Sequence, residues 1–279
     1  MTRVSVLTLV RNREAHLRQL VEGLRRSTVP PGELVIVDMS GVPIELPAAD
    51  FPVRLVRLET AGLPLAAARN LAAHTATGDR LVFLDVDCIP MAGCLARLVE
   101  TLATDDALLC ADVRYLAADA ARGDWSERDL LAGATPHPVR DFPAAGVRVE
   151  PNPGLFWSLA FAIRRARFAA LGGFDERFTG YGAEDTDFGV RAAAAGVPLL
   201  FVGGAIACHQ WHVAHEPPVQ HLDDIVRNAN RFHAIHGWWP MRGWLEQFAA
   251  LGLVDWTDDH LARSARATGA LDDMKETMR

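Results

Sequence analysis

The first 116 residues alternate short apolar, β-branched runs with amphipathic stretches of helical period. The run VSVLTLV (4–10) is typical of a buried strand, and the stretch after it (13–26) places apolar residues at helical spacing between charged ones. Alternation of this kind predicts an α/β fold, with a mostly parallel sheet and helices on its faces. The predicted strands are 4–10, 33–38, 52–59, 80–85 and 107–116, and the predicted helices are 13–26, 63–78 and 92–103.

The second half of the chain is less regular. The stretch 117–153 is polar, carries prolines and glycines, and loses the periodic pattern, which is typical of a binding loop or lid but also of a surface insertion. The elements predicted after it are a strand (155–165), a helix (182–196) and a strand (197–203). Beyond residue 216 the sequence is helical in pattern and rich in aromatic residues. We therefore predict one domain over residues 1–215 and a C-terminal helical appendage over residues 216–279.

Composition excludes several classes of protein. The chain is 50% hydrophobic, so it can bury a sizeable core, and its net charge of -7 argues against nucleic-acid binding, which needs a basic stripe. The four cysteines form no CxxC pair, which predicts reduced thiols and a cytoplasmic location rather than a disulfide framework or a zinc ribbon. No apolar stretch is long enough to predict a membrane span, and peripheral membrane contact stays open.

Two carboxylates, Asp85 and Asp87, follow the fourth predicted strand in the sequence FLDVDCIP (83–90), and Asp38 ends the second. Ligands of open α/β sheets bind outside the carboxyl ends of the strands, so these acids are expected at the ligand edge. In an extended segment residues i and i+2 point the same way, so both carboxylates could face one divalent cation. The alternative is that two acids on a loop only cap a helix.

Three more acids, Glu184, Asp185 and Asp187, crowd the first turn of the predicted helix 182–196. Like charges so close raise each other's pKa, and a carboxylate of raised pKa can act as a general base towards a hydroxyl. Compensation of the helix dipole is the other interpretation, and it explains one or two of the acids better than all three.

A histidine cluster, CHQWHVAHE (208–216), follows the last predicted strand. His209, His212 and His215 recur at a spacing of three, and imidazole clusters suit borderline transition metals. The residues leave two interpretations open, a metal site or satisfied core histidines.

The order and spacing of these motifs resemble those of GT-A fold glycosyltransferases of family 2. Residues 4–24 are similar to the family's nucleotide-binding strand and helix, LVIVDMSG (34–41) to its second strand, and 63–90 to the stretch that ends in the DxD motif. GGFDERFTGYGAEDTDFGVR (172–191) resembles a segment of the β-1,4-galactosyltransferase and polypeptide N-acetylgalactosaminyltransferase groups, with Tyr181 replacing the usual tryptophan. The resemblance covers residues 4 to 215.

The resemblance implies a GT-A (Rossmann-like) sheet and roles for individual residues. Asp87 would ligate Mn²⁺ or Mg²⁺ together with His209 and His212, where the galactosyltransferase group has a methionine and a histidine. Asp185 would be the catalytic base, and Glu184 would orient the acceptor or the sugar. The residues implied to bind the nucleotide sugar are Thr8, Arg11, Asp38, Arg69, Asp85 and Tyr181.

The implied reaction is metal-dependent transfer of a hexose or N-acetylhexosamine from a UDP-sugar to an acceptor hydroxyl, with inversion in one displacement. The acceptor is not identified by any motif, and a glycan, a lipid carrier, a small molecule and a peptide all stay open.

Other functions fit the sequence less well. A Rossmann oxidoreductase or a P-loop enzyme would need a glycine-rich loop after the first strand, and a sugar-nucleotide pyrophosphorylase would need one as well. None is present there. Two alternatives stay open: an inactive sugar-nucleotide or carbohydrate binder, and a zinc hydrolase built on His209, His212 and His215.

Overall fold

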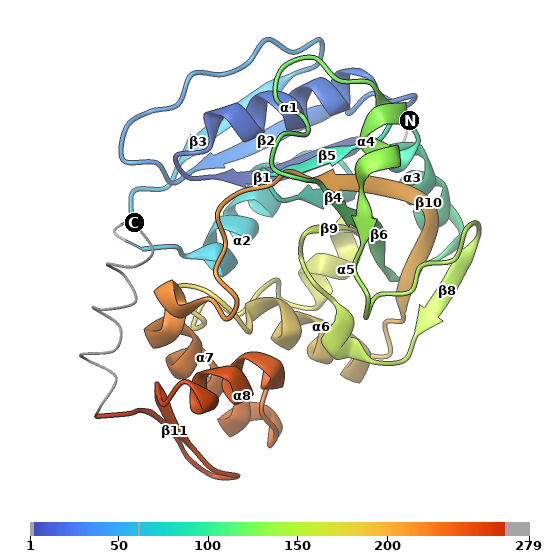
Figure 1. Cartoon of the computed structure of the whole chain (residues 1–279). Coiled ribbons are helices and arrows are strands. Elements are labelled where there is room, and N and C mark those ends of the chain that lie inside the picture. The colour runs from blue at the N-terminus through green and yellow to red at the C-terminus, as the bar shows by residue number, and fades with distance from the viewer. Residues whose placement is uncertain (1–2, 61, 266–279) are drawn as a thin grey trace.

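The central strand β1 (Val4–Val10) is buried along its whole length, because it pairs in parallel with β2 (Glu33–Asp38) on one side and with β4 (Arg80–Leu84) on the other. The computed structural model describes residues 3–60 and 62–265, and in these ranges the main sheet has ten strands (Figure 1). Their order is β3-β2-β1-β4-β9-β6-β10-β5, with β7 paired to β6 and β8 paired to β10. The other strands are β3 (Val53–Arg57), β5 (Cys88–Pro90), β6 (Leu108–Tyr115), β7 (Thr135–Pro136), β8 (Val147–Glu150), β9 (Ala160–Arg164) and β10 (Leu199–His209).

The predicted α/β class is confirmed, and β1 to β4 are parallel as expected. Strand β9 was predicted over 155–165 but begins at Ala160, because a short 3-10 helix (Pro153–Leu155) precedes it. It runs antiparallel between β4 and β6, which makes the sheet mixed. The last predicted strand, 197–203, continues to His209, because the chain bulges at Gly203 and Gly204 instead of ending there.

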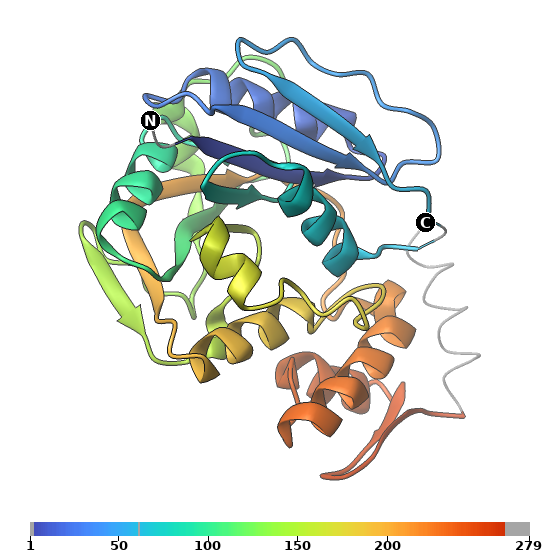
Figure 2. The same cartoon turned by 180° about the vertical axis from the view of Figure 1, so that it is seen from behind.

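Helices cover both faces of the sheet (Figures 1 and 2). Apolar side chains of α1 (Glu14–Arg25) and α3 (Cys94–Thr104) pack into one core cluster on the first face. Those of α2 (Leu65–Thr75), α5 (Arg165–Ala170) and α6 (Glu184–Ala194) pack into a second cluster on the other face. The stretch predicted to be irregular contains one short helix, α4 (Glu127–Gly133), besides β7 and β8.

The C-terminal region packs around a small core of its own, which includes Ile225, Leu245 and Phe248. It contains a 3-10 turn (Val219–His221), helices α7 (Leu222–His236) and α8 (Arg242–Ala250), and a hairpin of β11 (Val254–Trp256) and β12 (Leu261–Arg263). The hairpin was not expected in the helical appendage. The division at residue 215 stays a prediction, and residues 266–279 of the predicted appendage lie outside the described residues.

The remaining expectations concern the membrane and the cysteines. No helix among residues 3–60 and 62–265 has the length and hydropathy required to cross a bilayer. All four cysteines are free and buried, as expected for reduced thiols.

A buried acid, Glu33, links β1 to β2 by hydrogen bonds at the end of the sheet opposite the predicted site. Glu33 is fully buried, and its Oε1 accepts hydrogen bonds of 2.6 Å from Ser5 and from both the amide and the hydroxyl of Thr77. Arg54 lies 3.0 Å from Oε2. Burial raises the pKa of Glu33, but the hydrogen bonds and the Arg54 charge outweigh it and lower that pKa to about 2.

Replacing this acid should destabilise the fold in a pH-dependent way. Glu33→Gln is expected to lower the free energy of unfolding at pH 7 by about 1–3 kcal/mol, since charged hydrogen bonds are lost. A depressed pKa stabilises the fold above the unfolded-state pKa, so the difference between wild type and variant should shrink as pH falls from 4.5 towards 2. Urea unfolding at pH 7, 5 and 3.5 measures it, and a difference independent of pH would contradict the assignment.

Candidate metal and nucleotide-sugar site

The ligand edge of the sheet is where the parallel strands β1, β2 and β4 end. Arg11 follows β1, Asp38 is the last residue of β2, and Asp85 follows β4. The sequence predicted Asp38, Asp85 and Asp87 at one edge, and the parallel register of β1 with β2 and β4 brings the ends of these strands together there.

The two acids of the DxD motif do not lie in an extended segment, so that premise was wrong. The Cys88 amide donates to the Asp85 carbonyl at 2.8 Å, which makes residues 85–88 a tight turn from β4 into β5. As a result Asp85 and Asp87 contact different partners. Strand β5 then pairs antiparallel with the end of β10, with Cys88 opposite His209.

That pairing brings Asp87 to the histidines. His209 Nε2 lies 3.4 Å from Asp87 Oδ1, and His212 Nε2 lies 3.4 Å from Oδ2. One ligand atom from each of the three residues lies within 4.8 Å of the others. His215 is not part of this group. The structure thus groups the acid and the two histidines that the resemblance selected, and not the three histidines of the hydrolase hypothesis.

The electrostatics of the cluster suit a divalent cation. Burial raises the pKa of Asp87, but His209, His212 and Arg13 outweigh it and lower that pKa to about 2, so the carboxylate is ionised. Its Oδ1 is buried and has no hydrogen-bond partner among the residues that the structure describes. Burial lowers the pKa of His209, which favours the neutral imidazole that a metal requires, whereas the hydrogen bond with Asp87 raises the pKa of His212. One carboxylate oxygen and two imidazole nitrogens form a mixed ligand set that can hold a divalent transition metal such as Mn²⁺.

Arg69 joins the DxD turn to the acidic helix. Its buried guanidinium donates to Glu184 Oε1 at 2.9 Å and lies 3.5 Å from Asp85 Oδ1. Burial raises the pKa of Asp85, Arg69 opposes that effect, Asp87 and Glu184 add to it, and the resulting pKa is about 7. Arg69 therefore holds two carboxylates of the site in place, besides any contact with nucleotide.

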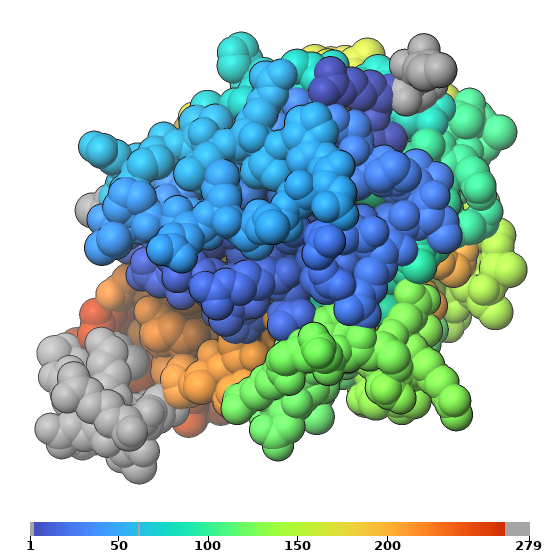
Figure 3. Space-filling model, turned by 90° about the horizontal axis from the view of Figure 1, so that it is seen from above, coloured from blue at the N-terminus to red at the C-terminus, as the bar shows by residue number. Residues whose placement is uncertain are grey.

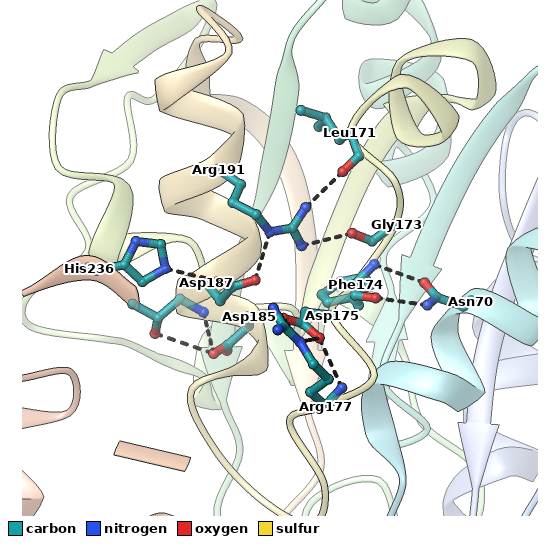
Figure 4. A network of polar contacts seen from close by, with 11 residues as sticks. Asn70, Leu171, Gly173, Phe174, Asp175, Arg177, Asp185, Asp187, Arg191 and His236 are labelled. Atoms are coloured by element: carbon teal, nitrogen blue, oxygen red, sulfur yellow. Dashed lines mark hydrogen bonds and ion pairs between the residues drawn. The ribbon is translucent and has the colours of Figure 1, made fainter. Parts of the chain in front are cut away.

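The three acids of α6 have different surroundings. Glu184 pairs with Arg69, and Asp187 pairs with Arg191 at 2.8 Å and with His236 at 2.9 Å (Figure 4). Within the described residues, Asp185 has no such cation at ion-pair distance. Dipole compensation alone does not explain this arrangement, because two acids are held by specific cations and one is left.

Asp185 has the properties of a base. Its carboxylate accepts a 2.7 Å hydrogen bond from the Thr186 amide. Burial and the neighbouring Glu184 raise its pKa, Arg69 and the amides of Thr186 and Ser158 oppose them, and the result is a pKa of about 6. A carboxylate of this pKa is ionised at neutral pH and still binds a proton readily.

The other residues predicted to bind nucleotide are less accessible. Asp38 is fully buried, accepts from the Ser40 amide at 2.8 Å, and lies 3.4 Å from Arg57. Thr8 is buried within β1, and its hydroxyl has no partner among the described residues. Their contacts with nucleotide stay predictions.

Arg11 and Tyr181 lie nearer the surface. The Arg11 guanidinium donates to the Gly62 carbonyl. Tyr181 is half-buried and stacks on His221 at 4.4 Å, beside the C-terminal region. The role of each in binding the sugar nucleotide also stays a prediction.

Arg13 was missed in the sequence. Its Nη1 donates to Asp87 Oδ2 at 2.9 Å, so a guanidinium lies against the predicted metal ligand. Two other segments of the chain, one around residue 123 and one around residue 211, form hydrogen bonds with α1 and lie against it (Figure 3). A basic residue straight after the first strand was the available signal, but Arg13 was counted only as the first residue of the predicted helix 13–26.

Comparison with known proteins identifies the family. The model described as glycosyl transferase family 2 matches residues 5–169, and the one described as N-terminal domain of galactosyltransferase matches residues 150–215. A pre-mycofactocin glycosyltransferase of Mycobacterium tuberculosis is 31% identical over 81% of this chain and 45% of its own length. A chondroitin synthase of Escherichia coli is 29% identical over 60% of this chain and 27% of its own length. The chain thus spans less than half the length of either relative.

Solved structures agree on the fold. GalNAc-T7, solved with UDP, GalNAc and Mn²⁺, superposes with a TM-score of 0.57 and 18% identity, covering 90% of this chain and 57% of its own. Residues 1–349 of TarS from S. aureus give a TM-score of 0.54 and 16% identity over 81% of this chain and 64% of that one. These likenesses confirm the GT-A fold. Since the family model matches more than half of the chain, the chain belongs to glycosyl transferase family 2.

Proposed function

We propose that this protein is a metal-dependent inverting glycosyltransferase that moves a hexose or N-acetylhexosamine from a UDP-sugar to an acceptor hydroxyl. The observation that carries the proposal is the cluster of Asp87, His209 and His212 at the ligand edge of a GT-A sheet. The orphaned Asp87 Oδ1 is a ligand atom of the kind such a metal needs. A cytoplasmic location stays a prediction.

Each residue of the site has its own role in the proposed reaction. A divalent cation bound by Asp87, His209 and His212 would neutralise the diphosphate and stabilise the leaving nucleotide. Asp185 removes the proton from the acceptor hydroxyl, and that oxygen attacks the anomeric carbon in line with the departing UDP oxygen. Arg69 keeps Asp85 and Glu184 beside the reacting sugar. No protein nucleophile is needed, because one displacement inverts the configuration.

Calorimetric titration of UDP into the protein with Mn²⁺, and then with EDTA, tests the proposal. GDP and ADP serve as the comparison nucleotides, and the choice of UDP is supported by the fold neighbour that was solved with it. Binding that needs the metal and prefers UDP is the expected result. Zinc that stays bound to the purified protein, with an affinity that nucleotide does not change, would favour the hydrolase. UDP binding without release of UDP from any UDP-sugar would favour the inactive binder.

A further inference from the structure

The segment 179–187, which carries Glu184 and Asp185, is held from outside the sheet by helix α7. We propose that α7 holds this segment in its catalytic position, with Asn228 and His236 acting as positioning residues for Asp185. This inference rests on the proposed function, since it concerns the same base. It is independent of which sugar or acceptor the protein uses.

The backbone just before α6, residues 179–183, lies outside helices and strands. Gly180, Gly182 and Ala183 all have positive φ, at 78°, 94° and 70°, so the chain turns sharply just before the two acids. Carbonyls in such a turn have no regular helix or strand partner. Thr179 is exposed and Tyr181 and Gly182 are half-buried, so their carbonyls can be paired by water or by a partner from elsewhere in the fold.

Asn228 is that partner. It is fully buried on α7, and its Nδ2 lies at hydrogen-bond distance from three carbonyls of the turn, at 3.0 Å from Thr179, 3.2 Å from Tyr181 and 2.9 Å from Gly182. One amide group therefore spans the whole reversal that leads into Glu184. Its side chain fixes the path of the turn more tightly than a single hydrogen bond would.

Two further residues of α7 hold the same turn. The Tyr181 amide donates to Asp224 Oδ2 at 3.2 Å, and Arg227 donates to the Thr179 carbonyl at 2.6 Å. The approach is close, since a Cβ added to Gly180 would lie 2.2 Å from the Asp224 carboxylate. The turn and the helix are therefore fitted to each other.

A second contact lies on the other side of the two acids. His236, at the end of α7, bonds to Asp187 Oδ1 at 2.9 Å, and Arg191 donates to Asp187 Oδ2 at 2.8 Å (Figure 4). Arg191 also donates to the carbonyls of Leu171 and Gly173, at 2.7 and 2.8 Å. Asp185 thus lies between two points of attachment, and α7 supplies a side chain to both.

Placement of this kind matters for rate, because a displacement of about 1 Å in a catalytic group can cost about 100-fold. Among the described residues, Asp87, His209 and His212 form no hydrogen bond or ion pair with α7, so binding of UDP with Mn²⁺ should not depend on it. Loss of the contacts between α7 and residues 179–187 should therefore lower kcat and leave binding of UDP with Mn²⁺ intact.

The test compares Asn228→Ala with Asn230→Ala. Asn230 is the matched control, because it lies on the same helix and donates to two carbonyls, of Val226 and Leu261, away from the acids. UDP release from a UDP-sugar to water is followed, so no acceptor is needed. For Asn228→Ala we expect kcat to fall about 10-fold or more, while the Kd of UDP–Mn²⁺ stays within about twofold of the wild-type value. For Asn230→Ala we expect kcat close to that of the wild type.

Hydrogen exchange measured by mass spectrometry tests whether α7 holds residues 179–187, and this readout does not require that the protein hydrolyse a UDP-sugar. In Asn228→Ala, amides of 179–187 should exchange faster, while those of β4 and β5 keep their wild-type rates. If Asn228→Ala does not fold, His236→Ala tests the second attachment, with a smaller loss of kcat and faster exchange in the first turn of α6. Unchanged exchange over 179–187 in a folded variant, or unchanged kcat in an active one, would overturn the proposal. Wild type that releases no UDP would instead count against the proposed function.

Discussion

Asp185→Asn should lower kcat by about 10²- to 10⁴-fold, because the acceptor or water then loses its general base. The variant keeps the size of the side chain, and its contact with the Thr186 amide needs only an oxygen acceptor. The Kd of UDP–Mn²⁺ should stay near the wild-type value, since Asp185 lies outside the metal ligands. Steady-state UDP release and calorimetry on the same samples measure both quantities.

The pH dependence of kcat/KM tests whether Asp185 acts in its unprotonated form. A base works unprotonated, so kcat/KM of the wild type should rise with pH through about 6 and level off above it. Because the Glu184 charge raises the pKa of Asp185, Glu184→Gln should move that limb to lower pH. A limb that persists unchanged in Asp185→Asn would assign the base to another residue.

Asp87→Ala should abolish metal-dependent binding of UDP. The variant removes the one carboxylate of the ligand cluster, and two imidazoles alone, His209 and His212, leave a cation poorly held and its charge less neutralised. Calorimetry with Mn²⁺ should show the wild-type signal disappear, and the residual binding should be the same in EDTA.

Arg13→Gln is the matched control for that experiment, because Arg13 contacts the same carboxylate without being a metal ligand. Removing the guanidinium takes away a competitor for Asp87 Oδ2, so Mn²⁺ binding should be retained or tightened. If Asp87→Ala folds and still binds UDP only when Mn²⁺ is present, the ligand assignment is wrong. If Arg13→Gln loses Mn²⁺ as completely as Asp87→Ala, the guanidinium is needed to form the site.

The strand and helix periods predicted the first four parallel strands and the two helices between β1 and β4 with small errors at their ends. They did not predict that β9 runs antiparallel between β4 and β6, because the sequence of a short, mostly buried strand does not indicate its direction. The end of β10 was also missed, since two glycines look like a turn when they form a bulge inside a strand.

The residues of the candidate site could likewise be predicted only in part. Asp85, Asp87, Glu184 and Asp185 could be selected from the sequence, because each stands at the end of an element whose pattern is local. Their partners could not. Arg69 and Glu184 are 115 positions apart, and Asn228 and Gly182 are 46 apart, so only the packing of α2, α6 and α7 decides that they meet.

The sequence by itself determined the α/β class, the edge of the sheet that carries the acids and the helix that carries the predicted base, Asp185. These follow from side-chain periodicity and from the common direction of parallel strands. Only the tertiary structure decided that Asp87 faces two histidines, that Arg69 joins Asp85 to Glu184, and that α7 holds the turn before Asp185. Such contacts depend on strand register and helix packing, which are set by the whole core, and no single stretch of the chain encodes them.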